Sequence, residues 1–158
     1  MIRPAAFALR VFLLAPAMLA TAACTTAPAD FYDFASVCAK LPNAENRKLP
    51  LAAASDDWFR IYESGEGVYS IVEPFHVQGT ISHLILGRDR ALLFDTGIGL
   101  LPLRPVVERI TDLPVVVINS HTHYDHVGGN AEFDTVLAVD TDYTRANMAG
   151  FSAARLAG

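Results

Sequence analysis

The run VVVIN at residues 115–119 is the feature that most constrains the fold. Four consecutive apolar residues, all of them β-branched, favour an extended chain. The lack of polar alternation is typical of a strand that is buried on both faces. A strand of that kind lies inside a sheet that other elements cover. We therefore expect a layered domain of strands and helices around residues 115–119.

The segments before this run are short and rich in strand-forming residues. Turn signals such as SGEG and Pro74 separate them. Only the tripeptide RDR joins residues 80–87 to residues 91–97, so these two segments are predicted to form an antiparallel hairpin. The predicted strands lie at residues 58–62, 68–74, 80–87 and 91–97.

Helices are expected both before and after residues 115–119 in the sequence. Residues 101–112 place apolar side chains at helical spacing, with Pro105 early in the segment. Residues 135–140 are predicted to form another short buried strand. Residues 141–158 have helical character, and Thr141 or Asp142 is a suitable N-cap. The order of elements predicts an α/β layered domain.

Length and composition limit the classes of protein to consider. The chain has 158 residues, enough for one domain, and 52% of them are apolar, enough for a packed core. The formal net charge is −5 and no basic run is present. We therefore expect a small-molecule substrate rather than a nucleic acid as partner.

The first residues have the layout of a secretory signal peptide. Arg3 and Arg10 precede or flank an apolar run, which is followed by small residues and Cys24. Cleavage is expected either after the A-x-A site at residues 20–22 or before Cys24, which would then be lipidated. The sequence thus predicts an exported protein, periplasmic or secreted, with membrane anchoring through Cys24 as an open alternative. Cys38 is interpreted as a passive thiol.

These observations predict three regions. Residues 1–23 form the signal peptide, residues 24–57 a tether or linker, and residues 58–158 the folded domain.

The loop after residue 119 gathers side chains that ligate metals. The six residues 121–126 contain His121, His123, Asp125 and His126. Three of the chain's five histidines therefore fall in this one loop. If the loop leaves the strand extended, the imidazoles of His121 and His123 point to the same side. Imidazole nitrogens and a carboxylate suit zinc, and also iron or manganese. Gly128 and Gly129 are expected to let the backbone turn sharply behind them.

Two motifs resemble a known family. HTHYDH at residues 121–126 is similar to the HxHxDH signature of the metallo-β-lactamase fold, and FDTG at residues 94–97 resembles the upstream turn of that family. The resemblance covers roughly residues 58–150. It implies an αβ/βα sandwich with metals at one edge of its two sheets. Only the N-terminal half of that fold is expected in this chain.

The resemblance also implies roles for individual residues. His121 and His123 correspond to ligands of a first metal, and Asp125 and His126 to ligands of a second. Asp125 further corresponds to the family's proton acceptor. Asp95 corresponds to the residue that lies beneath the site and supports the ligand loop.

The reaction implied by the resemblance is hydrolysis by a metal-bound hydroxide, because a bound cation lowers the pKa of its water to near 7. The cofactor would be one or two divalent ions, with zinc preferred over iron or manganese. Substrates of the family include thioesters, lactones, β-lactams and phosphate or sulfate esters, and the sequence does not select among them.

Four other side chains have predicted roles. His76, in a loop between predicted strands, is a candidate for lining the substrate site. His83 is in phase with Ile81 and Ile85 and is expected to be a packed strand residue. Tyr124 is expected to position the loop, and Trp58 to pack in the core or at its edge.

The sequence departs from the family in one respect. No histidine follows His126, whereas the family draws further ligands from downstream. We therefore expect an N-terminal piece of a longer protein, with one sheet face uncovered and apolar. The alternatives are a non-catalytic half-fold that binds a metal or ligand, and a non-catalytic periplasmic lipoprotein.

Overall fold

A computed structural model describes residues 36, 39–42 and 48–150. The predicted signal peptide, Cys24, Cys38 and the end of the last predicted helix lie outside the described residues. In the part of the chain that is described, no helix has the length and apolarity needed to cross a membrane.

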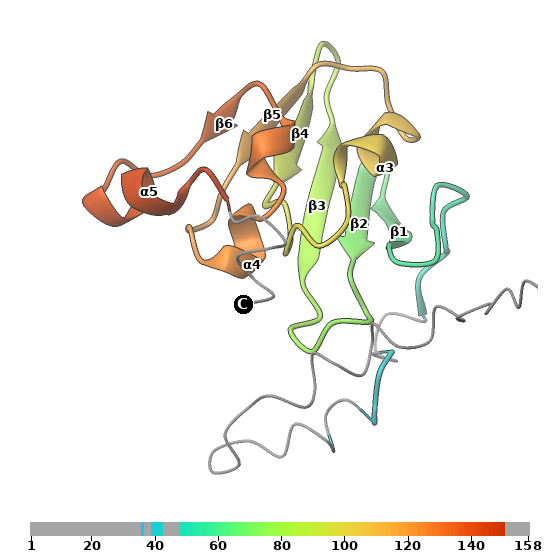
Figure 1. Ribbon diagram of the computed structural model, residues 1–158. Coiled ribbons are helices and arrows are strands. Elements are labelled where there is room, and N and C mark those ends of the chain that lie inside the picture. The colour runs from blue at the N-terminus through green and yellow to red at the C-terminus, as the bar shows by residue number, and fades with distance from the viewer. Residues whose placement is uncertain (1–35, 37–38, 43–47, 151–158) are drawn as a thin grey trace, which may run out of the picture.

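One mixed sheet of six strands, in the order β1-β2-β3-β4-β5-β6, forms the framework (Figure 1). β1 to β4 are antiparallel neighbours, whereas β5 pairs parallel to β4, and β6 parallel to β5. The strands are β1 (Arg60–Gly65), β2 (Val68–Val72), β3 (Ile81–Leu86), β4 (Ala91–Phe94), β5 (Val115–Ile118) and β6 (Val136–Leu137). The α/β prediction and the β3–β4 hairpin are confirmed.

The helices are short. They are α3 (Arg104–Glu108), α4 (Tyr124–Val127) and α5 (Asp142–Asn147), with a 3-10 turn at Asn130–Glu132. Pro105 stands in the first turn of α3, where its missing N–H has no helical partner to lose. Thr141 caps α5 by accepting a hydrogen bond from the Thr144 amide at 3.1 Å, as the sequence predicts.

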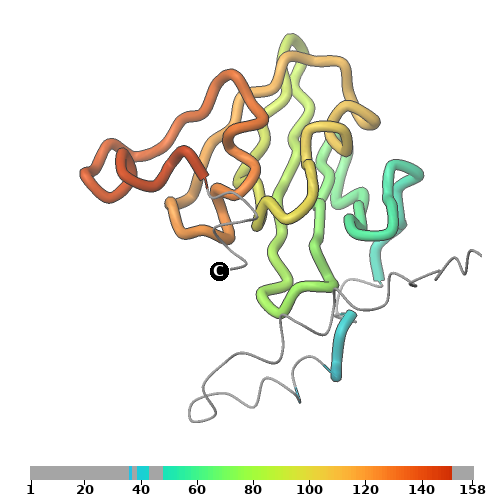
Figure 2. Tube along the Cα trace, in the orientation of Figure 1, coloured from blue at the N-terminus to red at the C-terminus, as the bar shows by residue number. Residues whose placement is uncertain are grey.

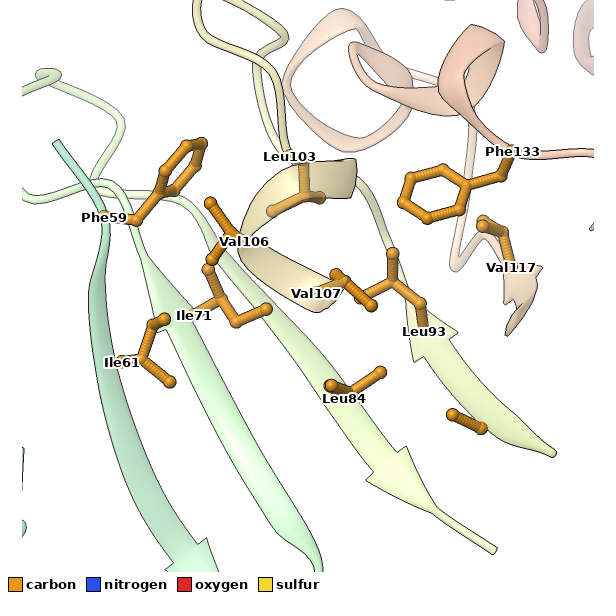
Figure 3. Packing of buried hydrophobic residues seen from close by; sticks show 11 residues of the cluster. Phe59, Ile61, Ile71, Leu84, Leu93, Leu103, Val106, Val107, Val117 and Phe133 are labelled. Atoms are coloured by element: carbon orange, nitrogen blue, oxygen red, sulfur yellow. The ribbon is translucent and has the colours of Figure 1, made fainter. Parts of the chain in front are cut away.

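The core lies between one face of the sheet and α3 (Figure 3). Side chains alternate along each strand, so every second residue faces α3. Burying such apolar groups contributes about 25 cal/mol per Å² removed from water. The buried cluster consists of Phe59, Ile61, Ile71, Leu84, Ala91, Leu93, Leu103, Val106, Val107, Val117 and Phe133.

The opposite face of the sheet carries apolar side chains that remain exposed. Ile81, Ile85 and Phe94 keep 37–40% of their surface accessible, and Leu137 keeps 50%. The prediction of an uncovered apolar face is thus confirmed for the described residues. His83 lies on this face, half-buried, with Nδ1 3.1 Å from the Ser70 hydroxyl of β2. It is a strand residue packed against a neighbouring strand, as predicted.

Two predictions need correction. Of the residues in β5, only Val117 is fully buried, and Leu137 of β6 is exposed, because the short β6 leaves the outer face of β5 partly open. The folded unit also begins before Trp58. Ala52 donates to the Ile61 carbonyl, and Arg109 binds Asp56, so the last residues of the predicted tether are part of the fold.

Candidate metal centre

Three strands end at the same edge of the sheet and there position polar residues. β2, β4 and β5 run in the same direction, so the residues that follow them lie at one edge. Glu73 follows β2, Asp95 follows β4, and Asn119 follows β5. Figure 2 shows the 73–80 connection and the loop that contains α4 toward the same end of the sheet. The histidine-rich loop is held at this edge.

Asp95 occupies a backbone conformation that side chains rarely adopt. Its φ is 61°, in the left-handed region, which Asp tolerates better than most residues. Its carboxylate is almost fully buried and accepts hydrogen bonds from the Ser120 amide at 2.8 Å and the Ser120 hydroxyl at 2.7 Å. It also lies 2.8 Å from Nδ1 of His126. Asp95 therefore holds the start of the loop and one of its imidazoles.

The ligand-type side chains predicted from the sequence are brought together. His121 and His123 lie on the same side of the loop, with Nε2 of His121 3.1 Å from Nδ1 of His123. The rings of His121 and His126 have centroids 4.0 Å apart. Nε2 of His126 lies 3.6 Å from Oδ2 of Asp125.

These spacings allow a test of whether a metal fits. Two atoms bound to one zinc ion at about 2.0–2.2 Å in tetrahedral geometry lie about 3.3–3.6 Å apart. The His121–His123 pair and the Asp125–His126 pair both come close to this separation. Among the described residues, no group of three or more His, Cys, Asp or Glu side chains is arranged to hold an ion. The described part of the chain thus offers two pairs of donors that fit two ions.

Electrostatics keep the exposed imidazole of His121 ready to act as a ligand. Slight desolvation, and then the charge that His126 and His123 carry when protonated, lower its pKa, although Asp95 and Asp125 oppose this. A neutral imidazole is the form that binds a metal. At neutral pH, His121 is therefore more fully available than an ordinary histidine.

His76 borders the loop. It is half-buried, burial lowers its pKa, and the charge of Asp125 acts in the opposite direction. In the same connection, Gln78 Nε2 donates to the Tyr124 hydroxyl at 2.8 Å. The 73–80 connection therefore lies against α4, as expected of a segment that lines a site on this side. Trp58 donates from its indole to Glu73 at 2.9 Å, at the edge of the core.

The glycines behind the loop serve close approach rather than a sharp turn. Gly128 has ordinary helical angles, but a Cβ there would lie 2.0 Å from the Ile98 carbonyl carbon. The Gly128 amide donates to the Gly97 carbonyl at 2.9 Å. The expected role in turning the backbone is thus wrong for Gly128, whose missing side chain lets α4 pack directly on the turn after β4.

Sequence reasoning missed the residues that buttress this contact. Glu73 is buried and accepts from the Ile98 amide at 3.0 Å, and its Oε1 lies 2.0 Å from where a Cβ on Gly97 would be. Asn119 and Asn130 are buried and bonded to each other, which ties the two ends of the loop. Glu73 and Asn119 each follow a strand and Asn130 begins the 3-10 turn, but only the folded chain shows their partners.

A family model provides the deciding observation. Residues 78–147 match the model described as Metallo-beta-lactamase superfamily. Residues 78–147 are a metallo-beta-lactamase superfamily segment. This superfamily segment contains Asp95, the whole histidine loop and α5, which agrees with the resemblance found in the sequence.

Three curated relatives match part of this chain, and each is called acyl-coenzyme A thioesterase MBLAC2. The Homo sapiens protein is 29% identical over 94 residues, which is 51% of this chain and 34% of the relative. The Bos taurus protein is 28% identical over 94 residues, with the same coverage. The Gallus gallus protein is 32% identical over 92 residues, covering 51% of this chain and 33% of the relative. The chain spans about a third of the length of these relatives.

Proposed function

We propose that this chain is the metal-binding part of an exported, metal-dependent hydrolase that acts on a small-molecule thioester. The observation that carries the proposal is the geometry of the loop. Two pairs of donor atoms, His121 with His123 and Asp125 with His126, lie 3.1 and 3.6 Å apart. The superfamily match over the same residues supports it.

The proposal gives each side chain a task. His121 and His123 would hold one divalent ion, and Asp125 and His126 a second, with zinc preferred and iron or manganese as alternatives. Such ions supply Lewis acidity and lower the pKa of a water molecule. The carboxylate of Asp125 would accept a proton during hydrolysis, and Asp95 would keep the imidazole of His126 oriented.

The substrate class is the next step of the proposal. The relatives are named as acyl-coenzyme A thioesterases, which favours a thioester over an ester, lactone or lactam. His76 would border the acyl group or its carrier, because the 73–80 connection lies against α4.

We further propose that the sheet is the first half of an αβ/βα sandwich. α3 covers one face, whereas Ile81, Ile85 and Phe94 on the other remain exposed. An apolar face of this kind favours contact with a second layer. Export rests on the signal-like residues 1–23, and anchoring through Cys24 remains the alternative to a free periplasmic or secreted protein.

The experiment compares His123→Ala with His83→Ala as a matched control. Both variants lose an imidazole, but His83 lies in β3 and its side chain contacts Ser70 of β2 rather than a residue of the loop. Zinc content after dialysis and the hydrolysis of acyl-coenzyme A thioesters would be measured for each. We expect His123→Ala to lose both by at least about tenfold, whereas His83→Ala keeps them.

Zinc binding without hydrolysis would distinguish the two candidate functions. The described residues offer donor pairs rather than a group of three. Protein that binds zinc but hydrolyses no thioester, ester, lactone or lactam would overturn the hydrolase. It would favour the non-catalytic alternative, a fold that binds a metal or ligand.

A further inference from the structure

Ser120 lies at the junction between β5 and the histidine loop, where its hydroxyl meets three side chains. Its Oγ is 2.7 Å from Oδ2 of Asp95, 3.0 Å from Nδ1 of His121 and 3.4 Å from Nδ1 of His126. Its backbone amide donates to the other oxygen of Asp95 at 2.8 Å. The serine is thus fixed against the buried carboxylate by two hydrogen bonds.

The directions of these hydrogen bonds follow from the number of protons. A carboxylate only accepts, so the single hydroxyl proton of Ser120 points to Asp95. Toward His121, the same oxygen has only a lone pair to offer. A 3.0 Å contact between two lone pairs would be repulsive, so Nδ1 of His121 must carry the proton. A neutral ring has one such proton, which leaves Nε2 bare.

We propose that Ser120 is a positioning residue that relays the charge of Asp95 to His121 and fixes the Nδ1–H tautomer of that imidazole. Asp95 acts on His126 directly, through the 2.8 Å contact with its Nδ1, and on His121 through the serine. One carboxylate therefore sets the proton on two imidazoles, one in each donor pair. Both rings then offer Nε2 as the free nitrogen.

The contact with His123 has the complementary arrangement. Nε2 of His121 faces Nδ1 of His123 at 3.1 Å. Because Nε2 of His121 is bare, Nδ1 of His123 carries the proton of this hydrogen bond in the metal-free protein. A metal held between the two nitrogens would need both lone pairs. In that case only His123 would have to move its proton to Nε2, while His121 would already be in the binding form.

The tautomer can be measured without any metal. Long-range ¹H–¹⁵N correlation spectra distinguish protonated from bare ring nitrogens. They would be recorded on metal-free protein near pH 8.5, where ordinary imidazoles are neutral. We expect Nδ1–H and bare Nε2 for both His121 and His126. In Ser120→Ala, His121 should become a mixture of tautomers while His126, which contacts Asp95 directly, keeps its own. Ser120→Thr retains a hydroxyl and should restore His121.

The consequence for metal binding rests on the proposed function and is measured separately. Loss of a group that orients a ligand typically weakens metal binding 10–100-fold. We expect that loss of Zn²⁺ affinity in Ser120→Ala, by competition with a chromophoric chelator, and near wild-type affinity in Ser120→Thr. Ser64→Ala removes a serine hydroxyl bonded to Ser70 on the strands and should change neither readout.

Two results would overturn the relay. One is a wild-type spectrum in which His121 carries its proton on Nε2. The other is an unchanged His121 tautomer in Ser120→Ala. Failure of wild-type protein to bind Zn²⁺ would instead overturn the proposed metal function, because the spectra need no metal.

Discussion

Replacing Glu73 with alanine should remove a large part of the stability of this fold. The carboxylate of Glu73 is 3% exposed and accepts from the Ile98 amide at 3.0 Å and the Trp58 indole at 2.9 Å. Thr80 adds a weaker contact at 3.3 Å. Alanine leaves two N–H donors without their acceptor, and each buried donor left unpaired costs about 1–3 kcal/mol. The indole of Trp58 is only half-buried and can turn to water, so we expect a net loss of about 3 kcal/mol.

Urea unfolding followed by circular dichroism and by the fluorescence of Trp58, the single tryptophan, measures this loss. Small domains have total stabilities of about 5–15 kcal/mol, so the midpoint should fall clearly. Glu66→Ala, at an exposed turn between β1 and β2, is the matched control and should change stability by less than about 0.5 kcal/mol. Equal effects of the two substitutions would refute the argument that Glu73 ties Ile98 to the sheet.

The burial of Glu73 also predicts how the free energy of unfolding changes with pH. Burial raises the pKa of Glu73 above the ordinary value of 4.5, although hydrogen bonds from Ile98, Trp58 and Thr80 oppose the shift. The folded state therefore holds this proton at pH values where the unfolded state has lost it. The associated stability is present below pH 4.5 and is lost as the pH rises through the folded pKa. Relative to Glu73→Gln, wild-type protein should lose stability over that window, and a rise instead would contradict the burial.

Three other substitutions test separate contacts by the same unfolding assay. Gly128→Ala should destabilise by about 1–3 kcal/mol, because the new Cβ would lie 2.0 Å from the Ile98 carbonyl carbon; an unchanged midpoint would show that the two segments separate easily. Thr122→Val should be neutral or stabilising by up to about 1 kcal/mol, because the buried Thr122 hydroxyl has no partner among the described residues; a clear loss would reveal one. Thr141→Ala should cost about 0.5–2 kcal/mol by removing the cap of α5, and Thr141→Ser should recover most of it.

The sequence determined the local features of this protein. The four residues between Leu86 and Ala91 are too few for anything but an antiparallel connection, and β3 and β4 pair accordingly. Thr141 caps a helix because its hydroxyl reaches an amide three residues on. The composition and spacing of the loop at residues 121–126 likewise predict its ligand chemistry, because both depend on neighbours along the chain.

The tertiary structure decided how those ligands are held. Asp95 contacts Ser120 and His126, which lie 25 and 31 residues away in the sequence, and Glu73 supports Ile98 across 25. The spacing of apolar and polar residues along the sequence does not predict such contacts, because they depend on three strands ending at one edge of a sheet. The half-buried state of His83 and the partly open outer face of β5 were decided in the same way, since burial depends on which elements cover each face rather than on the strand itself.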